Sequence, residues 1–148
     1  MKPIVHLTSG IALGGLMYGI THNWGTSVWG SIAAFASDID HVCEYGVYCT
    51  LNRKLPRLSV FFSGKYFKEK GTIFLLLHGW EYEILLLLAW MLSLLNELPS
   101  AIILGSLFLG YGLHLVLDSI GNDIGFLGYF LYYRWHFRFS EEILCHGI

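Results

Sequence analysis

The chain has 148 residues, of which 55% are hydrophobic and only 14% are charged. About a quarter of the residues of a soluble domain are charged, so this composition argues against an ordinary soluble protein, and the mean hydropathy of +0.55 agrees. Three cysteines without a CxxC pair argue against a disulfide framework and against a cysteine-ligated zinc site.

Four long apolar segments follow one another along the chain, and each has about the 20 residues that cross a bilayer as a helix. The first begins after Lys2. Because it contains His6 and no small-residue cleavage site follows it, we expect a retained helix and not a signal peptide. The third and fourth are joined by a short NELP turn, in which Pro99 opens the next helix. The expected spans are residues 4–22, 27–46, 71–95 and 99–120.

Two further stretches are basic and aromatic. The first, TLNRKLPRLSVFFSGKYFKEKG, lies between the second and third segments and is typical of a loop with short interfacial helices. The second is the tail, FLGYFLYYRWHFRFSEEILCHGI, where Arg134 and Arg138 argue against a fifth span. The sequence therefore predicts an all-α fold over residues 1–148: a single domain built as an integral membrane four-helix bundle, with an interfacial loop and C-terminal helices.

The basic residues predict the orientation of this bundle. With four spans, the N-terminus, the 47–70 loop and the C-terminus lie on one side, and all nine Lys and Arg residues fall in these three regions. Because cytoplasmic loops carry the excess of positive charge, we expect a multi-pass protein of the inner (cytoplasmic) membrane with both termini in the cytoplasm.

Histidines and acids occur in all four expected spans. A charged side chain at the centre of a bilayer costs roughly 2.5–3.5 kcal/mol on insertion scales. Asp38 and His41 are three residues apart, and His114 and Asp118 are four apart, so each pair shares a helix face. Small residues continue these faces and would let the helices approach closely. At about 1.5 Å per residue, the polar groups reach one layer below the cytoplasmic surface. The predicted ligands of a metal site in this layer are His6, Asp38, His41, His78, His114 and Asp118.

The predicted ligand set limits the metal. Imidazole and carboxylate ligands suit zinc, manganese or iron, and six ligands are better used by two ions that share a carboxylate than by one tetrahedral zinc. We expect one or two divalent transition-metal ions, with zinc as the first choice. His6 taken alone could instead make a helix–helix hydrogen bond. Glu81 and Asp40 are the candidates for a general base. Basic residues near the interface are candidates for holding a phosphate headgroup: Arg53, Lys54, Arg57, Arg134 and Arg138.

The order of these motifs resembles the family of small membrane-bound metal-dependent hydrolases, whose best-known members are described as LexA-binding inner-membrane-associated hydrolases. The likeness covers roughly residues 6–120 and rests most on DIDH at 38–41 and HLVLD at 114–118. It implies a metal-dependent hydrolase with ligands at His6, Asp38, His41, His114 and Asp118. The chain departs from the family pattern at Ser37, where the family usually has proline, and in LLLHGWEYE, which has one histidine and no arginine. A fainter similarity links the chain to zinc-dependent phospholipase C.

These observations predict a membrane-embedded hydrolase that acts on a phosphoester of a lipid-like substrate at the cytoplasmic leaflet. The depth of the site favours a lipid over a soluble substrate. We expect membrane lipid and a lipid-like substrate as partners, and no nucleic acid. Two other classes stay open. A metal ion or proton transporter would extend polar groups toward the far side of the bundle, and a non-catalytic membrane adaptor with a structural metal would need no open coordination position.

Overall fold

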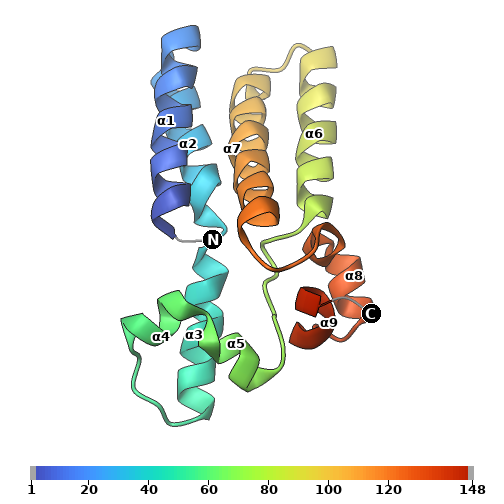
Figure 1. The fold of residues 1–148 in the computed structure, drawn as a ribbon. Coiled ribbons are helices and arrows are strands. Elements are labelled where there is room, and N and C mark those ends of the chain that lie inside the picture. The colour runs from blue at the N-terminus through green and yellow to red at the C-terminus, as the bar shows by residue number, and fades with distance from the viewer. Residues whose placement is uncertain (1–2, 147–148) are drawn as a thin grey trace.

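The computed structural model describes residues 3–146. Within that range it contains helices and loops, and no strand beyond a single antiparallel bridge between Thr72 and Ser140. The predicted all-α fold is therefore confirmed. Figure 1 shows two tiers: a bundle of helices that stand side by side, and a second group of helices at one end of it. The bundle comprises α1 (Pro3–Thr21), α2 (Trp24–Ala36), α6 (Trp80–Leu95) and α7 (Ser100–Gly121). The lower tier comprises α3 (Ile39–Leu51), α4 (Leu58–Ser63), α5 (Lys65–Lys70), η1 (Phe126–Tyr129), α8 (Leu131–His136) and α9 (Glu141–His146).

Small residues set the spacing of the bundle helices. Helix α2 packs against both α1 and α7, and α7 packs against α6, so the helices stand in the order α1, α2, α7, α6 (Figure 1). A Cβ atom on Gly110 of α7 would collide with the backbone of Gly30 on α2, and Gly10 of α1 lies directly against Ser31 and Ala34. The glycines therefore allow close approach of the helices, as the small-residue faces predicted.

The outer surface of the bundle is apolar, whereas its interior holds small and polar side chains. Ile20 on α1 is 72% exposed and Leu92 on α6 is 60% exposed, while Ser106 of α7 and Thr26 of α2 are buried. Two stretches, Ile4–Thr21 and Ser100–Gly121, are long and apolar enough to cross a membrane, by length and composition. The other two bundle helices, with 13 and 16 residues, are shorter than the roughly 20 residues of a full span.

The expected span over 27–46 is interrupted within its SDID motif. Helix α2 ends at Ala36 and α3 begins at Ile39. Between them, the amide of Asp38 donates to the carbonyl of Phe35 and the amide of Asp40 to that of Ser37. These bonds reach back three residues, so a tight turn replaces the regular α-helical pattern. The carboxylate of Asp38 makes no capping bond and remains available to the site.

The expected span over 71–95 also differs from the structure, because residues 71–79 are not helical. Helix α5 ends at Lys70, and the Gly71 that follows has a φ of 71°, in the left-handed region that favours glycine. The segment that follows is bound to the C-terminal tail: the amide of Ile73 donates to the carbonyl of Phe139, and the amide of Glu141 to that of Gly71. Helix α6 begins only at Trp80. Backbone bonds to the tail thus replace helical bonds in this segment.

Aromatic packing and ion pairs stabilise the lower tier. Tyr45, Tyr48 and Tyr66 form a buried cluster between α3 and α5. The ammonium of Lys54 lies 2.6 Å from the carboxylate of Glu69. The hydrogen bond from Lys54 lowers the pKa of Glu69. The ammonium of Lys54 is therefore already paired and is not free to bind a headgroup.

Candidate metal centre

The six predicted ligands converge where the two tiers meet. His6 lies in the first turns of α1, Asp38 in the break after α2, and His41 in α3. His78 belongs to the extended segment before α6, and His114 and Asp118 lie in the last turns of α7. His6, His78, His114 and Asp118 are each at most 1% exposed. Elements that are distant in sequence therefore bring acids and imidazoles into one buried cluster.

Two imidazoles at the centre of the cluster face each other through their Nε2 atoms. Nδ1 of His114 lies 3.0 Å from the carbonyl oxygen of Ala34, which can only accept a hydrogen bond. Nδ1 of His78 lies 3.1 Å from Oδ2 of Asp40, also an acceptor when ionised. Both Nδ1 atoms therefore carry a proton. The two Nε2 atoms then face each other across 3.0 Å, where either a shared proton or a metal cation can lie between them.

Two carboxylates complete a set of four donor atoms. Oδ2 of Asp118 lies 3.5 Å from Nε2 of His78 and 3.6 Å from Nε2 of His114. Oδ1 of Asp38 lies 3.8 Å from Nε2 of His78. Tetrahedral zinc with bonds of about 2.0–2.2 Å keeps its ligand atoms roughly 3.3 Å apart. The spacing and chemistry of His78, His114 and Asp118 thus fit three ligands of one such ion, and Asp38 lies beside them.

Additional donors surround this set. Oδ1 of Asp38 also lies 3.8 Å from Nε2 of His41, so Asp38 stands between His41 and His78, where a carboxylate can bridge two ions. Nε2 of His6 lies 2.9 Å from Oδ1 of Asp118. Three overlapping groups have donor atoms within 4.8 Å of one another: His6–His114–Asp118, Asp38–His78–His114 and Asp40–His41–His78. The cluster can therefore hold a metal ion and has donors left over for a second.

Asp40 lies behind His78. Its Oδ2 accepts hydrogen bonds from Nδ1 of His78 and, at 2.8 Å, from the amide of Leu77. A carboxylate in this position fixes the tautomer and the ring orientation of a metal-binding histidine. The structure thus makes Asp40 a group that orients His78.

Glu81 lies outside the cluster. Its two carboxylate oxygens each accept a hydrogen bond, at 2.9 Å, from the amides of Leu131 and Tyr132. These are the first two residues of α8, whose amides have no partner within the helix. Glu81 therefore joins α6 to the C-terminal tail, and its role as a general base stays a prediction. No local spacing pointed to this contact, because the partners lie 50 and 51 residues further along the chain.

Arg134 lies in the interior of the lower tier, although the sequence predicted it at the membrane interface. It is only 2% exposed. Its guanidinium donates to the backbone carbonyls of Leu75 and His78. Burial lowers its pKa, and the nearby carboxylates of Asp40 and Glu81 oppose that shift. Arg134 therefore positions the His78 segment from behind and is not available for a headgroup.

The cluster opens on one side to a cavity of about 520 Å³. Asp38, His41 and Asp118 form part of its wall, and pockets of about 300–1,000 Å³ typically enclose small-molecule ligands. A catalytic zinc site keeps one position open to water or substrate, whereas a structural site is closed by protein ligands. An ion held by His78, His114 and Asp118 alone would keep one position free, and the cavity would give access to it.

Fold and site together define a helical protein with a buried His–Asp cluster, at one end of its bundle, that can hold a metal ion. Comparison of the chain with models of protein families, with curated proteins and with solved structures found no match. What the site does must therefore be argued from its own chemistry.

Proposed function

We propose that this chain is an integral membrane hydrolase that uses one or two divalent transition-metal ions, with zinc first, to cleave a phosphoester in a lipid-like substrate. The observation that carries this proposal is the pair of Nε2 atoms of His78 and His114, 3.0 Å apart with both Nδ1 atoms already engaged. Together with Asp118 and Asp38, they make a donor set whose chemistry suits zinc. The resemblance to membrane-bound metal-dependent hydrolases supports the same function.

The chain's own residues supply orientation and a path for the proton. Bound metal would polarise a phosphoryl oxygen and activate water as a nucleophile. Asp40 and the carbonyl of Ala34 keep His78 and His114 in the tautomer that presents Nε2. Asp38 and His41 line the cavity, whereas Asp40 and Glu81 are not among its lining residues. We therefore assign the acceptance of the proton from attacking water to Asp38 or His41, which is a change from the sequence-based choice.

The surface of the bundle supports a membrane location. Large apolar side chains are exposed on all four of its helices, among them Ile11, Trp29, Leu88 and Ile102, and an exposed apolar surface of this extent is rare on soluble monomers. Lys and Arg are absent from the two turns at the far end, residues 22–23 and 96–99, whereas every Lys and Arg of the described residues lies in the lower tier. Under this proposal the lower tier faces the cytoplasm, at the inner membrane.

A labelling experiment tests this orientation. Single cysteines would replace Asn96, in the far turn, or Arg53, after α3, in a chain whose three native cysteines are changed to serine. A membrane-impermeant maleimide added outside intact cells should label the first and not the second. The reverse pattern would overturn the proposed orientation.

A reconstitution experiment tests the reaction. The protein is purified without chelators, reconstituted in vesicles, and assayed for phosphate release from lipid phosphomonoesters and phosphodiesters. We expect hydrolysis that disappears after chelation and returns with zinc, because under this proposal the nucleophile is a water molecule activated by the metal. Fully metal-loaded protein that cleaves none of these lipids would overturn the hydrolase proposal.

Glu83 is the observation that keeps a transporter as the second candidate. It is buried on α6 against Gly112 of α7, and its Oε2 has no hydrogen-bond partner among the described residues. Further along the bundle the buried polar groups are hydroxyls, such as those of Ser93 and Ser106. Hydroxyls of this kind do not provide a chain of ionisable groups along which a proton or a metal ion could move. Zinc or proton flux into vesicles, lost in Glu83→Gln and present without hydrolysis, would favour transport.

A further inference from the structure

We propose that the cavity beside the metal cluster binds the hydrocarbon chain of the substrate, with the phosphate held at the wall formed by Asp38, His41 and Asp118. The substrate would then be an amphiphile with at least one alkyl chain, and not a small water-soluble phosphoester. This inference rests on the proposed hydrolase function, but binding of the alkyl chain in the cavity can be measured without measuring hydrolysis.

The lining of the cavity divides into a polar wall and apolar walls. The metal cluster contributes the polar wall. The other lining residues come from α1, α4, α5, the extended segment before α6, the end of α7 and the loop after it, η1 and α9, and about half of them are aromatic or aliphatic. The apolar side chains among them are Val5, Phe61, Phe62, Phe67, Ile73, Leu75 and Ile124. Binding of a hydrocarbon chain is favoured in proportion to the apolar area removed from water, so these walls suit a chain and not a second polar group.

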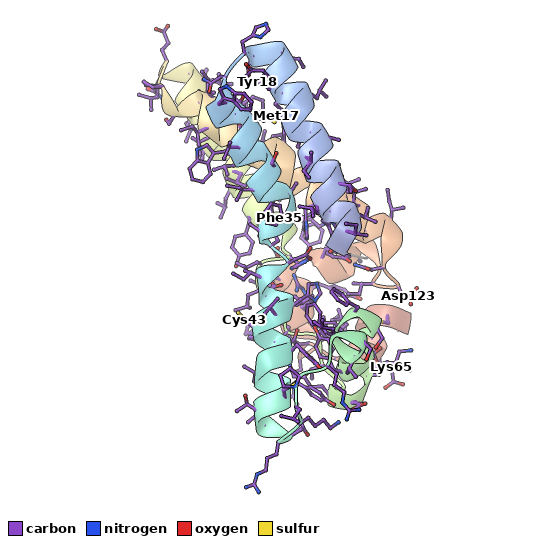
Figure 2. The ribbon with its side chains drawn as sticks, turned by 90° about the vertical axis from the view of Figure 1, so that its left-hand side faces the viewer. Met17, Tyr18, Phe35, Cys43, Lys65 and Asp123 are labelled. Carbon is purple, nitrogen blue, oxygen red and sulfur yellow. The ribbon has the colours of Figure 1, made fainter. Side chains whose placement is uncertain are left out.

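The position of the cavity suits a ligand that arrives from a bilayer. The last residues of α7, such as Gly121, line it from above, and residues of α4 and α5, such as Ser63 and Lys68, line it from below. Figure 2 shows Asp123, which follows α7, and Lys65, on α5, on the same side of the molecule, with Cys43 on the other side of α3. The cavity therefore lies at the level where the apolar bundle surface gives way to the lower tier.

Helix α4 provides an apolar edge on this side. Leu58 is 74% exposed and Phe62 is 60% exposed, and Phe62 is also one of the lining residues. An alkyl chain leaving the bilayer would thus pass from one apolar surface to another. The charged lining residues Lys68, Asp123 and Glu141 are of both signs, so they do not by themselves favour an anion. A bound metal ion would supply the positive charge that attracts phosphate.

Two native cysteines allow a direct test. Cys145 is partly buried and lines the cavity, whereas Cys43 is exposed outside it. Metal-loaded protein in vesicles of an uncharged glycolipid is treated with a small alkylating reagent in three arms: with dodecylphosphonate, whose C–P bond a phosphoesterase does not cleave, with inorganic phosphate, and with neither. Burial raises the pKa of Cys145 to about 11, so all arms share one alkaline pH. We expect dodecylphosphonate to slow alkylation of Cys145 several-fold and to leave Cys43 unchanged, and inorganic phosphate to protect neither.

A cavity-filling variant provides the second measurement. Ser63 is exposed and lines the cavity, so Ser63→Trp should occupy it without disturbing the core. Thr50→Trp, on the exposed surface of α3, is the matched control. With an alkyl phosphate that carries a photoreactive group on its chain, we expect crosslinking to residues 61–75 to fall several-fold in Ser63→Trp and to persist in Thr50→Trp. Equal metal content and melting temperature in both variants would show that the fold is intact.

The outcomes separate the two proposals. Hydrolysis of lipids with Cys145 unprotected, or with crosslinking unaffected by Ser63→Trp, would overturn the chain-binding cavity and leave the hydrolase standing. Protection of Cys145 without any hydrolysis would support the cavity and overturn the hydrolase. Labels spread evenly over the exposed bundle helices would also overturn the cavity.

Discussion

Two parts of the metal cluster are built in different ways. His114 and Asp118 stand four residues apart on α7, so the helix itself sets their separation. His78 lies on an extended segment, and its position depends on contacts made by Asp40, by Arg134 and by the tail. The same site therefore combines a half that depends on local periodicity with a half that depends on contacts across the chain.

This difference predicts where remote substitutions act. Changes in the C-terminal tail should reach the metal through His78, because Arg134 donates to its carbonyl. Changes between α2 and α7 should act on the stability of the bundle, because these helices meet through Gly30 and Gly110.

The largest effect is expected from removal of a helix-borne ligand. His114→Ala removes one of the two central Nε2 donors, and metal should fall to background in elemental analysis of chelator-free protein. Hydrolysis should be lost with it. His22→Ala, in the exposed turn just after α1, is the control and should keep full metal. Unchanged metal in His114→Ala would break the proposed site.

A smaller effect is expected on the other half of the site. Arg134→Met keeps the length of the side chain but leaves the carbonyls of Leu75 and His78 without their buried donor. Loss of groups that orient a ligand typically costs about 10–100-fold in metal affinity, and we expect a decrease of that size in a competition titration with a zinc chelator. Arg138→Met, at an exposed position of the same tail, should titrate like the wild type. Equal affinity in both variants would show that the tail does not position His78.

A third variant tests the close packing behind His114. In Gly110→Ala the new Cβ would collide with the backbone of Gly30. Overpacking costs typically about 1–3 kcal/mol, so unfolding in detergent should occur at a lower temperature. Gly19→Ala is the matched control, because no atom lies within 4 Å of a Cβ placed there. Equal melting of the two variants would contradict the helix contact.

The smallest effect is expected from Glu81→Gln, which replaces one acceptor oxygen by a donor group. It should lose one of the two hydrogen bonds to α8, worth about 0.5–1.5 kcal/mol net, and melt slightly earlier with its metal retained. Hydrolysis distinguishes the two roles of Glu81. A loss of a hundredfold or more with metal intact would match the usual scale of general-base catalysis and would restore Glu81 as the base.

Much of the fold was open to prediction from the sequence. Apolar segments at helical lengths predicted α1 and α7 closely, because their backbone bonds are local and their composition is uniform. Motif order and spacing also selected the six residues that meet at the end of the bundle. The break at Ser37 and Asp38 and the extended segment 71–79 were not predicted, because the apolar pattern runs through both without a proline.

What the sequence by itself determined was an all-helical chain with its acids and histidines spaced on common helix faces, since periodicity and hydropathy are local properties. What only the tertiary structure decided was the pairing of these groups. Glu81 binds amides 50 and 51 residues away, and Arg134 reaches carbonyls 56 and 59 residues away. The physical reason is that a buried polar group takes its partner from whatever backbone or side chain the fold places beside it, and that choice leaves no local trace in the sequence.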